Sequence, residues 1–348
     1  MHLRSLRSLR SYAKCAVIHG VGSEPAVQLL DDSDLVESIE RYDRWDIRHL
    51  WDPGGRSHTR REFREWFAQK RFDAIVNLTV APPVIQSVLE GLPSFEMDEA
   101  TYNKALRSGC SGYRALFCAN RSGWRLNGGD GHEDQALAIG VAREEEAGDT
   151  LHRLQADQVP CVVLSLSASL PMKRWPLERF AELADRVIQQ YSCRILFAAG
   201  PSDTWTEGIL EIMVHKDRAS FIPPLHLLTL ASLFKRCDLL IGNDTGTMHL
   251  ACAVGTPVLA IFGPTDPQVF LPPAKLVRSI GGIGVVCEKH GRHFQGVPQC
   301  WGESRCPCRA ESCINQVAVE SVTNAVHKIL EQRRPRSNGY HPNTSALE

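Results

Sequence analysis

The stretch CDLLIGNDTGTMHLACAVGTPVLAIFGPTDP, residues 237–267, decides the fold of this chain. Residues 238–242 form an apolar run of strand length, and the polar turn 243–246 ends it. A helix is expected over residues 247–254, followed by a second buried strand over residues 258–262. The stretch therefore predicts one strand–helix–strand unit of an α/β sheet.

The two turns of this unit point to a ligand site. Asp244 and Thr245 are good N-cap residues, and Gly255 suits the left-handed residue that ends a helix. Two buried strands joined by a helix run parallel, so the first turn lies at the carboxyl edge of the sheet, where α/β proteins bind ligands. An ordinary capped helix would explain this turn as well. A second polar turn at residues 263–267, on the same edge, favours the ligand site.

The same alternation of strand, turn and helix runs through residues 161–237. Apolar strands are expected at residues 161–166, 194–199 and 220–222, and helices near residues 204–215 and at residues 227–237. Pro176 precedes a run with helical spacing, made of Leu177, Phe180, Ala181, Ala184, Val187 and Ile188. This repetition predicts a doubly wound parallel sheet. Four loops then share its carboxyl edge: residues 167–174, 200–203, 243–246 and 263–267.

These four loops hold the polar residues of the region and suggest a site for an anion. Lys173 supplies a mobile cation, and the helix start at Gly246 supplies free N–H groups. Asp203 is either a partner of a ribose hydroxyl or a plain N-cap, and Asp244 is either an N-cap or an acceptor for sugar hydroxyls. His249 is either a core residue or faces the site.

Composition limits the possible classes of protein. The 348 residues are enough for two domains, and 43% hydrophobic with 23% charged residues is typical of a globular protein. The net charge of −1 gives no electrostatic reason to expect nucleic acid as a partner. No apolar run has the length of a membrane span. Twelve cysteines are too dilute for a disulfide scaffold and indicate a reducing, cytoplasmic setting.

The first half of the chain has a less regular pattern. The opening MHLRSLRSLRSY repeats Leu-Arg-Ser and favours an amphipathic helix over a transit peptide. Strands are expected at residues 14–19, 46–51, 72–80 and 113–118, helices at 25–30, 59–70, 84–92 and 135–141, and a polar loop at 121–134. A charged stretch ends this half. Domains are therefore expected at residues 1–158 and 159–330, followed by a disordered tail at 331–348.

The motifs of the second half resemble glycosyltransferase family 9, whose best-known members are the ADP-heptose:lipopolysaccharide heptosyltransferases. The similar residues are SASLPMKRWPLERFAELA and FAAGPSD within 167–203, then NDTGTMHLACAVGTP and FGPTDP. The resemblance covers roughly residues 162–330. It implies a GT-B architecture of two Rossmann-like domains facing a cleft, with the acceptor on the first domain and the nucleotide-sugar on the second.

The resemblance also implies roles for individual residues. Lys173 would contact the donor diphosphate. The phosphate and sugar would be held by Asp244, Thr245 and Gly246, with His249 nearby. The nucleotide would be approached by Ser169 and Asp203, and its adenine would pack on Leu225. Family members are inverting and have no tightly held metal or cofactor, so the nucleotide-sugar is a substrate. Charge on the leaving diphosphate is then met by Lys173 and the helix start.

One feature of the family pattern is not found in this sequence. The family begins with a strand and a Gly-Asp loop, and the Asp of this loop is taken as the general base. Residues 1–12 resemble the helix that follows that loop, so the first strand of the domain and the general-base Asp are expected to be absent from this sequence. The expected function is heptose transfer from ADP-heptose to a lipopolysaccharide-core-like glycolipid or oligosaccharide, with at most peripheral contact with the inner membrane. The alternative is a catalytically impaired nucleotide-sugar-binding paralogue.

Two other reaction classes are alternatives to glycosyl transfer. No G-x-G-x-x-G motif follows a strand, which disfavours a dinucleotide dehydrogenase. A sugar-nucleotide epimerase on the same architecture stays open, and product analysis would separate it from a transferase.

The late cysteines are a separate feature of the sequence. Cys287, Cys300, Cys306, Cys308 and Cys313 lack the paired C-x2-C spacing of a structural zinc site. Reduced thiols or an oxidation-prone pair are therefore expected rather than a metal.

Overall fold

The computed structural model divides the chain into two compact units, Met1–Gly131 and His132–Glu348. The described residues are 18–22, 24–30, 33, 35–41, 65–66, 69, 75–76, 94–95, 137–168, 170–200, 202–265, 267–271, 276–281, 286–287, 291–292 and 313–331. Among them no helix is both long enough and apolar enough to cross a membrane.

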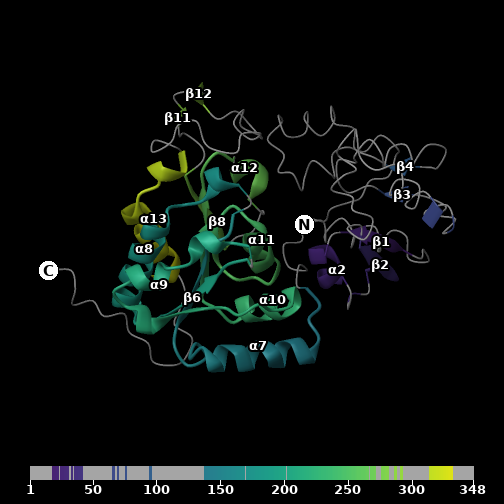
Figure 1. Ribbon diagram of the computed structural model, residues 1–348, viewed down its shortest axis with the longest axis horizontal. Helices are drawn as coiled ribbons and strands as arrows, with labels where there is room; N and C mark the ends of the chain where they lie inside the picture. The colour runs from purple at the N-terminus through teal and green to yellow at the C-terminus, as the bar shows by residue number, and fades with distance from the viewer. Residues whose placement is uncertain are drawn as a thin grey trace. The chain divides into compact units, whose positions relative to one another are not determined.

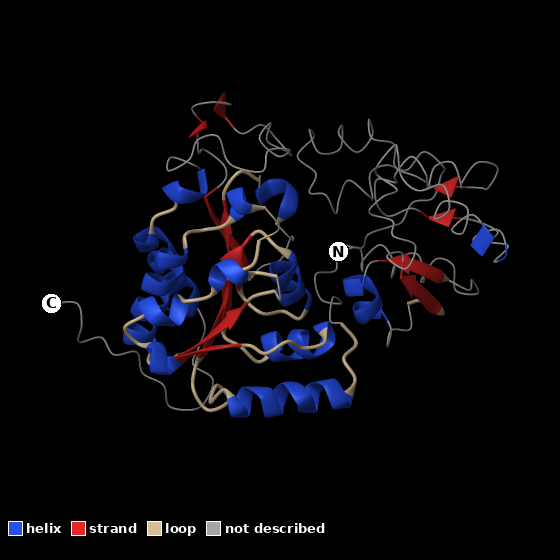
Figure 2. Cartoon of the chain, in the orientation of Figure 1, coloured by secondary structure: helices blue, strands red, loops and turns tan. Residues whose placement is uncertain are grey.

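The second unit is built on one parallel sheet (Figures 1 and 2). Its strands are β5 (Cys161–Ser165), β6 (Arg194–Ala198), β7 (Ala219–Phe221), β8 (Leu239–Asn243), β9 (Val258–Phe262) and β10 (Val277–Gly281). They lie in the order β10-β9-β8-β5-β6-β7, and every neighbouring pair is parallel. The predicted doubly wound parallel sheet is confirmed.

The strand order reverses direction between β5 and β8. From β5 the chain moves outward through β6 and β7, then returns to β8 and moves the other way through β9 and β10. Loops that leave β5 and β8 at their carboxyl ends therefore diverge, and open α/β sheets bind ligands between loops that diverge in this way. This topology places the turns after Ser165 and Asn243 at the position where open α/β sheets bind ligands.

Helices cover both faces of this sheet (Figure 1). They are α7 (Val141–Arg153), α8 (Leu177–Tyr191), α9 (Ile209–Ile212), α10 (Leu227–Lys235), α11 (Gly246–Ala253), α12 (Pro267–Phe270) and α13 (Val319–Glu331), with 3-10 turns η3 (Pro171–Lys173), η4 (Thr204–Thr206), η5 (Lys216–Arg218) and η8 (Cys313–Gln316). The residues expected at helical spacing in α8 are buried, apart from the partly buried Leu177, and they pack with α13 against the strands. Burial of this apolar stripe is what holds α8 on the sheet.

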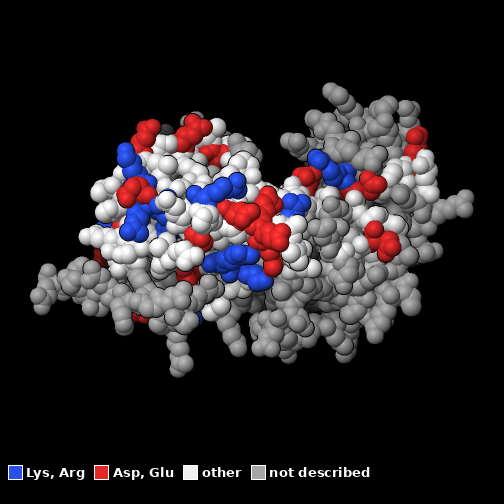
Figure 3. Space-filling view, turned by 90° about the horizontal axis from the view of Figure 1, so that it is seen from below, with Lys and Arg blue, Asp and Glu red and all other residues white. Residues whose placement is uncertain are grey.

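Helix α7 packs on α10, on the side of the sheet opposite α8 and α13 (Figure 1). Thr229 donates to the Glu146 carboxylate at 2.7 Å, and Arg236 donates to the Glu144 carbonyl at 2.8 Å. On the face seen in Figure 3, acidic and basic side chains are mixed. Lys235 of α10 also forms an ion pair with Glu144 of α7, at 3.4 Å.

Two predicted helices of this unit are wrong. The helix expected at residues 135–141 does not form over residues 137–140, and α7 begins only at Val141. A helix was expected from residue 204 to residue 215, but the chain forms the short turn η4, the four-residue helix α9 and the turn η5. The break lies at Gly208, whose φ of +88° is left-handed and incompatible with a continuous helix. By contrast, Gly255 has a φ of +78° after α11, as expected of a residue that ends a helix.

The first unit is described only in short pieces. Strand β1 (His19–Gly22) pairs in parallel with β2 (Ser38–Arg41), and α2 (Glu24–Leu30) connects them. Strand β3 (Ile75–Val76) pairs in parallel with β4 (Ser94–Phe95). Thus α2 matches the predicted helix at residues 25–30, and β3 lies inside the predicted strand at 72–80. The predicted elements at residues 1–12, 46–51, 84–92, 113–118 and 121–134, and the tail from residue 332, lie outside the described residues.

The late cysteines are mostly outside the described residues as well. Cys287 lies in β11 (Val286–Cys287), which pairs antiparallel with β12 (Gly291–Arg292), and Cys313 begins η8. Cys300, Cys306 and Cys308 are not described, so the state of this cluster stays a prediction.

Candidate functional site

A buried ion pair lies at the carboxyl ends of the neighbouring strands β5 and β8. Lys173 Nζ is 2.7 Å from Oδ2 of Asp244, and the two residues are only 7% and 5% exposed. Oδ2 also accepts from the Thr265 hydroxyl at 2.8 Å, and the ammonium lies 5.7 Å from the centre of the Phe270 ring. Residues from three of the four predicted loops therefore meet at one carboxylate.

The neighbouring Asn243 fixes the two loops to each other. Its side-chain Oδ1 accepts from the Trp175 backbone N–H at 3.0 Å, and its Nδ2 donates to the Leu166 carbonyl at 2.8 Å. Asn243 is fully buried, so these bonds replace water that it cannot reach. They hold the backbone on both sides of Lys173 against the end of β8.

Helix α11 begins directly after Asp244, and its start is not capped by a side chain. Thr245 occupies the N-cap position without a capping hydrogen bond, and the Asp244 carboxylate is engaged by Lys173 and Thr265. Thr245 therefore occupies the predicted N-cap position, but neither its side chain nor that of Asp244 makes a capping hydrogen bond. Because the first N–H groups of a helix have no partner within it, they remain available to an anion.

Gly246, the first residue of α11, leaves space at this helix start. A Cβ built on it would meet no atom within 4 Å, and its φ is not left-handed. Neither packing nor backbone geometry within the described residues requires glycine here. Close approach of a ligand to the backbone would require it.

His249 lies one turn into α11. Burial lowers the pKa of its imidazole to about 4, and the opposing effect of the Asp244 carboxylate does not offset it. The ring is therefore neutral at pH 7 and adds no charge to the site.

Asp203 organises the loop after β6. Its Oδ2 accepts from the Ser167 hydroxyl at 2.5 Å and from the Gly200 N–H at 2.8 Å, and its Oδ1 accepts from the Trp205 indole at 3.2 Å. The residue stands at the N-cap of η4, but its side chain makes no capping bond. A carboxylate oxygen can accept two hydrogen bonds, so Oδ1 can still accept one from a ligand.

For the other two predicted site residues, Leu225 and Ser169, the structure gives less detail. Leu225 is partly buried between β7 and α10. Ser169 lies outside the described residues. Asn243 links the two parts of the edge, because its Nδ2 also lies 3.4 Å from the carbonyl of Ser167, the residue that bonds Asp203. Polar groups thus run continuously from the loop after β6 to the start of α11.

Two residues of this arrangement have roles that the sequence did not indicate. Thr265 is 1% exposed and completes the environment of Asp244, and Ser167 fixes Asp203. Both belong to predicted loops. The sequence around a single Thr or Ser in a loop does not indicate which distant residue its hydroxyl will bond.

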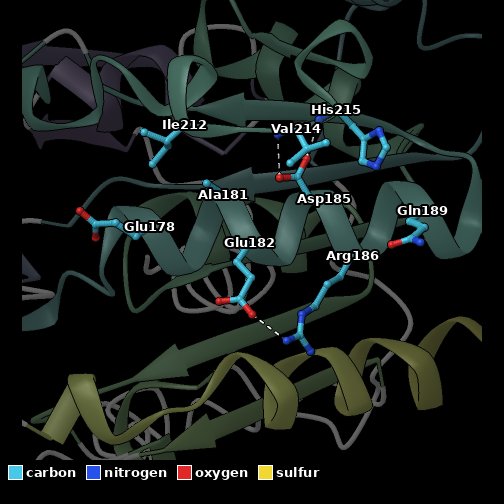
Figure 4. Close-up of a pocket in the computed structure, with 9 residues that line it drawn as sticks. All are labelled: Glu178, Ala181, Glu182, Asp185, Arg186, Gln189, Ile212, Val214 and His215. Carbon is cyan, nitrogen blue, oxygen red and sulfur yellow. Dashed lines mark hydrogen bonds and ion pairs between the residues drawn. The ribbon is translucent and has the colours of Figure 1, made fainter.

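A separate hollow of about 580 Å³ lies on the outside of α8 (Figure 4). Its lining includes none of the predicted site residues. Asp185, which faces it, accepts from the backbone N–H groups of Val214 and His215 at 2.9 and 2.8 Å, so this carboxylate holds the loop after α9. The hollow adds nothing to the site at the sheet edge.

Comparison with known proteins decides the family. The model of glycosyltransferase family 9 (heptosyltransferase) matches residues 118–293, which is just over half of the chain. The chain belongs to glycosyltransferase family 9. The resemblance seen in the motifs around Lys173 and Asp244 is thereby confirmed.

Curated relatives of this family 9 chain match a limited stretch. Lipooligosaccharide heptosyltransferase 2 of Haemophilus influenzae is 33% identical over 119 residues, which is 32% of this chain and 34% of that protein. Lipopolysaccharide heptosyltransferase 2 of Salmonella typhimurium is 31% identical over 136 residues, 37% and 38% of the two chains. The chain thus spans about a third of the length of these relatives.

Solved structures agree over most of the chain. A family 9 glycosyl transferase from Veillonella parvula has a TM-score of 0.73 at 18% identity, with 95% of this chain and 93% of that chain covered. ADP-heptose lps heptosyltransferase II of E. coli has a TM-score of 0.64 at 17% identity, with 94% of each covered. These likenesses and the parallel sheets confirm the predicted α/β fold class, the GT-B type of Rossmann-like domains.

Proposed function

We propose that this chain is an inverting glycosyltransferase that transfers heptose from ADP-heptose to a lipopolysaccharide-core-like acceptor. Family membership supports the reaction class. The observation that carries the proposal is the buried Lys173–Asp244 pair beside the uncapped start of α11. Residues 159–330 would bind the donor, and residues 1–158 would bind the acceptor.

The charges at the edge of the sheet suit a leaving diphosphate. In the reaction an acceptor hydroxyl attacks the anomeric carbon, the bond from that carbon to the diphosphate breaks, and ADP leaves with the electron pair. Negative charge grows on the diphosphate in the transition state. Lys173 and the free N–H groups of Thr245, Gly246 and Thr247 would meet that charge from fixed positions, which lowers the barrier without reorganisation.

Asp244 has two tasks in this scheme. It fixes the Lys173 ammonium in a buried position, and both of its contacts among the described residues use Oδ2. Its Oδ1 is then able to accept from a hydroxyl of the sugar. A general base must still take the proton of the attacking hydroxyl, and no described residue is assigned to that step.

The nucleoside would lie along the same edge, toward β6 and β7. Asp203 Oδ1 would accept from a ribose hydroxyl, Leu225 would pack on adenine, and Ser169 would approach the nucleotide. ADP-heptose enters as a substrate, and no metal or bound cofactor is part of the scheme. We further propose a cytoplasmic location, with the acceptor reached at the inner membrane surface.

The test is a transfer assay with the full chain. ADP-heptose and a heptose-deficient lipopolysaccharide core should give ADP and a core heavier by one heptose in mass spectrometry. Inversion predicts opposite anomeric configurations in donor and product by NMR. If the chain binds ADP but transfers no heptose, the non-catalytic paralogue is favoured. If the sugar of ADP-heptose is altered when no acceptor is present, an epimerase is favoured. Absence of both ADP binding and turnover would refute the proposal.

A further inference from the structure

Arg174 follows Lys173 directly but points to a different neighbour. Its guanidinium carbon lies 5.0 Å from the centre of the Trp205 ring, which belongs to η4 in the loop after β6. Its Nε is buried and has no hydrogen-bond partner among the described residues. A buried N–H without a partner is unfavourable, so such a group calls for an explanation.

The charge balance of the edge supplies that explanation. The sequence places only two Lys or Arg residues in the four carboxyl-edge loops, Lys173 and Arg174. Lys173 is neutralised by Asp244 at 2.7 Å, and the imidazole of His249 is uncharged at pH 7. A nucleoside diphosphate carries at least two negative charges. The paired lysine alone would leave this charge under-compensated.

Trp205 holds Arg174 in place through a chain of contacts. The indole Nε1 donates to Asp203 Oδ1 at 3.2 Å, and Asp203 Oδ2 accepts from Ser167, which is in the same loop as Arg174. An aromatic face attracts a guanidinium and leaves its N–H edge free to donate. Arg174 is therefore pre-oriented between the loop after β5 and the loop after β6.

We propose that Arg174 is a second phosphate-binding cation of the donor site and that Trp205 is its positioning residue. This inference rests on the proposed function, because it assigns a second contact for the diphosphate of the same donor. The planar guanidinium would donate from Nε and one Nη to two phosphate oxygens, a bidentate geometry that Lys173 cannot provide. Binding would supply the partner that Nε lacks.

Calorimetry with ADP and with adenosine tests this assignment. Replacing Arg174→Gln should weaken ADP binding by about 10- to 100-fold, the range for a charge-assisted hydrogen bond, and leave adenosine binding unchanged. Arg174→Lys should recover only part of the loss, because it keeps the charge and not the fork. Arg186→Gln is the matched control, since Arg186 is 45% exposed and pairs with Glu182 on the outside of α8.

A spectroscopic measurement on the unaltered chain covers the case in which the Gln variant does not fold. The Nε–Hε NMR signal of Arg174, assigned by its loss in Arg174→Lys, should move on addition of ADP and stay in place with adenosine. Trp205→Leu should weaken ADP binding less than Arg174→Gln, and the double variant should bind like Arg174→Gln alone.

The outcomes separate the two proposals. If the wild type binds ADP and Arg174→Gln binds it with the same affinity, the role of Arg174 is overturned and the donor site is left intact. A Nε–Hε signal that does not move on addition of ADP would have the same meaning. A wild-type chain that binds no ADP would overturn both.

Discussion

Lys173 Nζ lies 2.7 Å from Oδ2 of Asp244, and this contact joins the loop after β5 to the turn after β8. These two strands are neighbours at the point where the sheet changes direction. The pair therefore connects the two diverging loops between which open α/β sheets bind ligands. Because the pair is buried, it should contribute to the stability of the fold as well as to ligand binding.

Breaking this pair is expected to affect stability and binding together. Lys173→Met leaves the buried Asp244 carboxylate with Thr265 as its remaining described donor, so the free energy of unfolding should fall by about 3 kcal/mol. Lys173→Met combined with Asp244→Leu removes both charges and should restore most of the stability. It should not restore ADP binding. Urea unfolding and calorimetry measure the two effects separately.

The exposed pair Arg186–Glu182 is the control for this cycle. Its side chains are 45% and 49% exposed, so removing either should change stability by less than about 0.5 kcal/mol. Restoration of ADP binding in the double variant, or a double variant as unstable as Lys173→Met, would contradict the role given to the pair.

Two glycines near the site should respond oppositely to alanine. A Cβ on Gly242 would lie 2.5 Å from the Ser165 carbonyl oxygen, a backbone atom of β5 that cannot move aside, so Gly242→Ala should destabilise by about 3 kcal/mol. A Cβ on Gly246 meets nothing within 4 Å. Gly246→Ala should therefore keep or slightly raise the melting temperature and yet weaken ADP binding at least about tenfold. If Gly246→Ala binds ADP normally, the phosphate does not approach this backbone.

His249 should make stability depend on pH. The folded pKa of about 4 lies below the ordinary value of 6.5, so the unfolded chain binds more protons between these values. The stability that the neutral imidazole contributes is fully present above pH 6.5 and is lost as the pH falls toward 4. Between pH 7 and 5 the wild type should lose about 2 kcal/mol more stability than His249→Gln. Parallel pH curves for the two proteins would show that His249 titrates normally.

Asn243 should prove essential to the loop that presents Lys173. Asn243→Ala removes the partners of the Trp175 N–H and the Leu166 carbonyl, leaving buried polar groups unpaired, and should cost about 2–4 kcal/mol. Asn324→Ala, at an exposed position of α13, should change stability by less than about 0.5 kcal/mol. Equal melting temperatures for the two variants would argue against this function of Asn243.

The part of the fold that sequence predicted well is the part with strong local signals. Apolar runs of strand length between polar turns identified β8, α11 and β9, and the helix was displaced by only one residue, Gly246–Ala253 against 247–254. Strand β2 (Ser38–Arg41) was missed because the sequence SIER has no apolar run and its side chains are half-exposed or exposed. In the same way, Gly208 interrupts a stretch whose composition otherwise suits a helix.

The site was predicted as a set of residues but not as a set of contacts. Asp244 has the local signature of an N-cap, yet its carboxylate binds Lys173, 71 residues earlier in the chain. Asp203 likewise bonds Ser167, 36 residues away, instead of capping η4. Capping propensity is a local preference, and a partner distant in the sequence overrides it. The unpartnered Nε of Arg174 depends on tertiary packing and has no sequence signal at all.

The most direct test of the central claim is amide hydrogen exchange of the full chain with and without ADP. The first N–H groups of α11 have no partner within the helix and should exchange rapidly in the free protein. Saturating ADP should slow exchange in peptides that cover residues 243–250 and 170–176. Slower exchange confined to other segments, or none with ADP present at saturating concentration, would contradict a donor diphosphate site at Lys173, Asp244 and the start of α11.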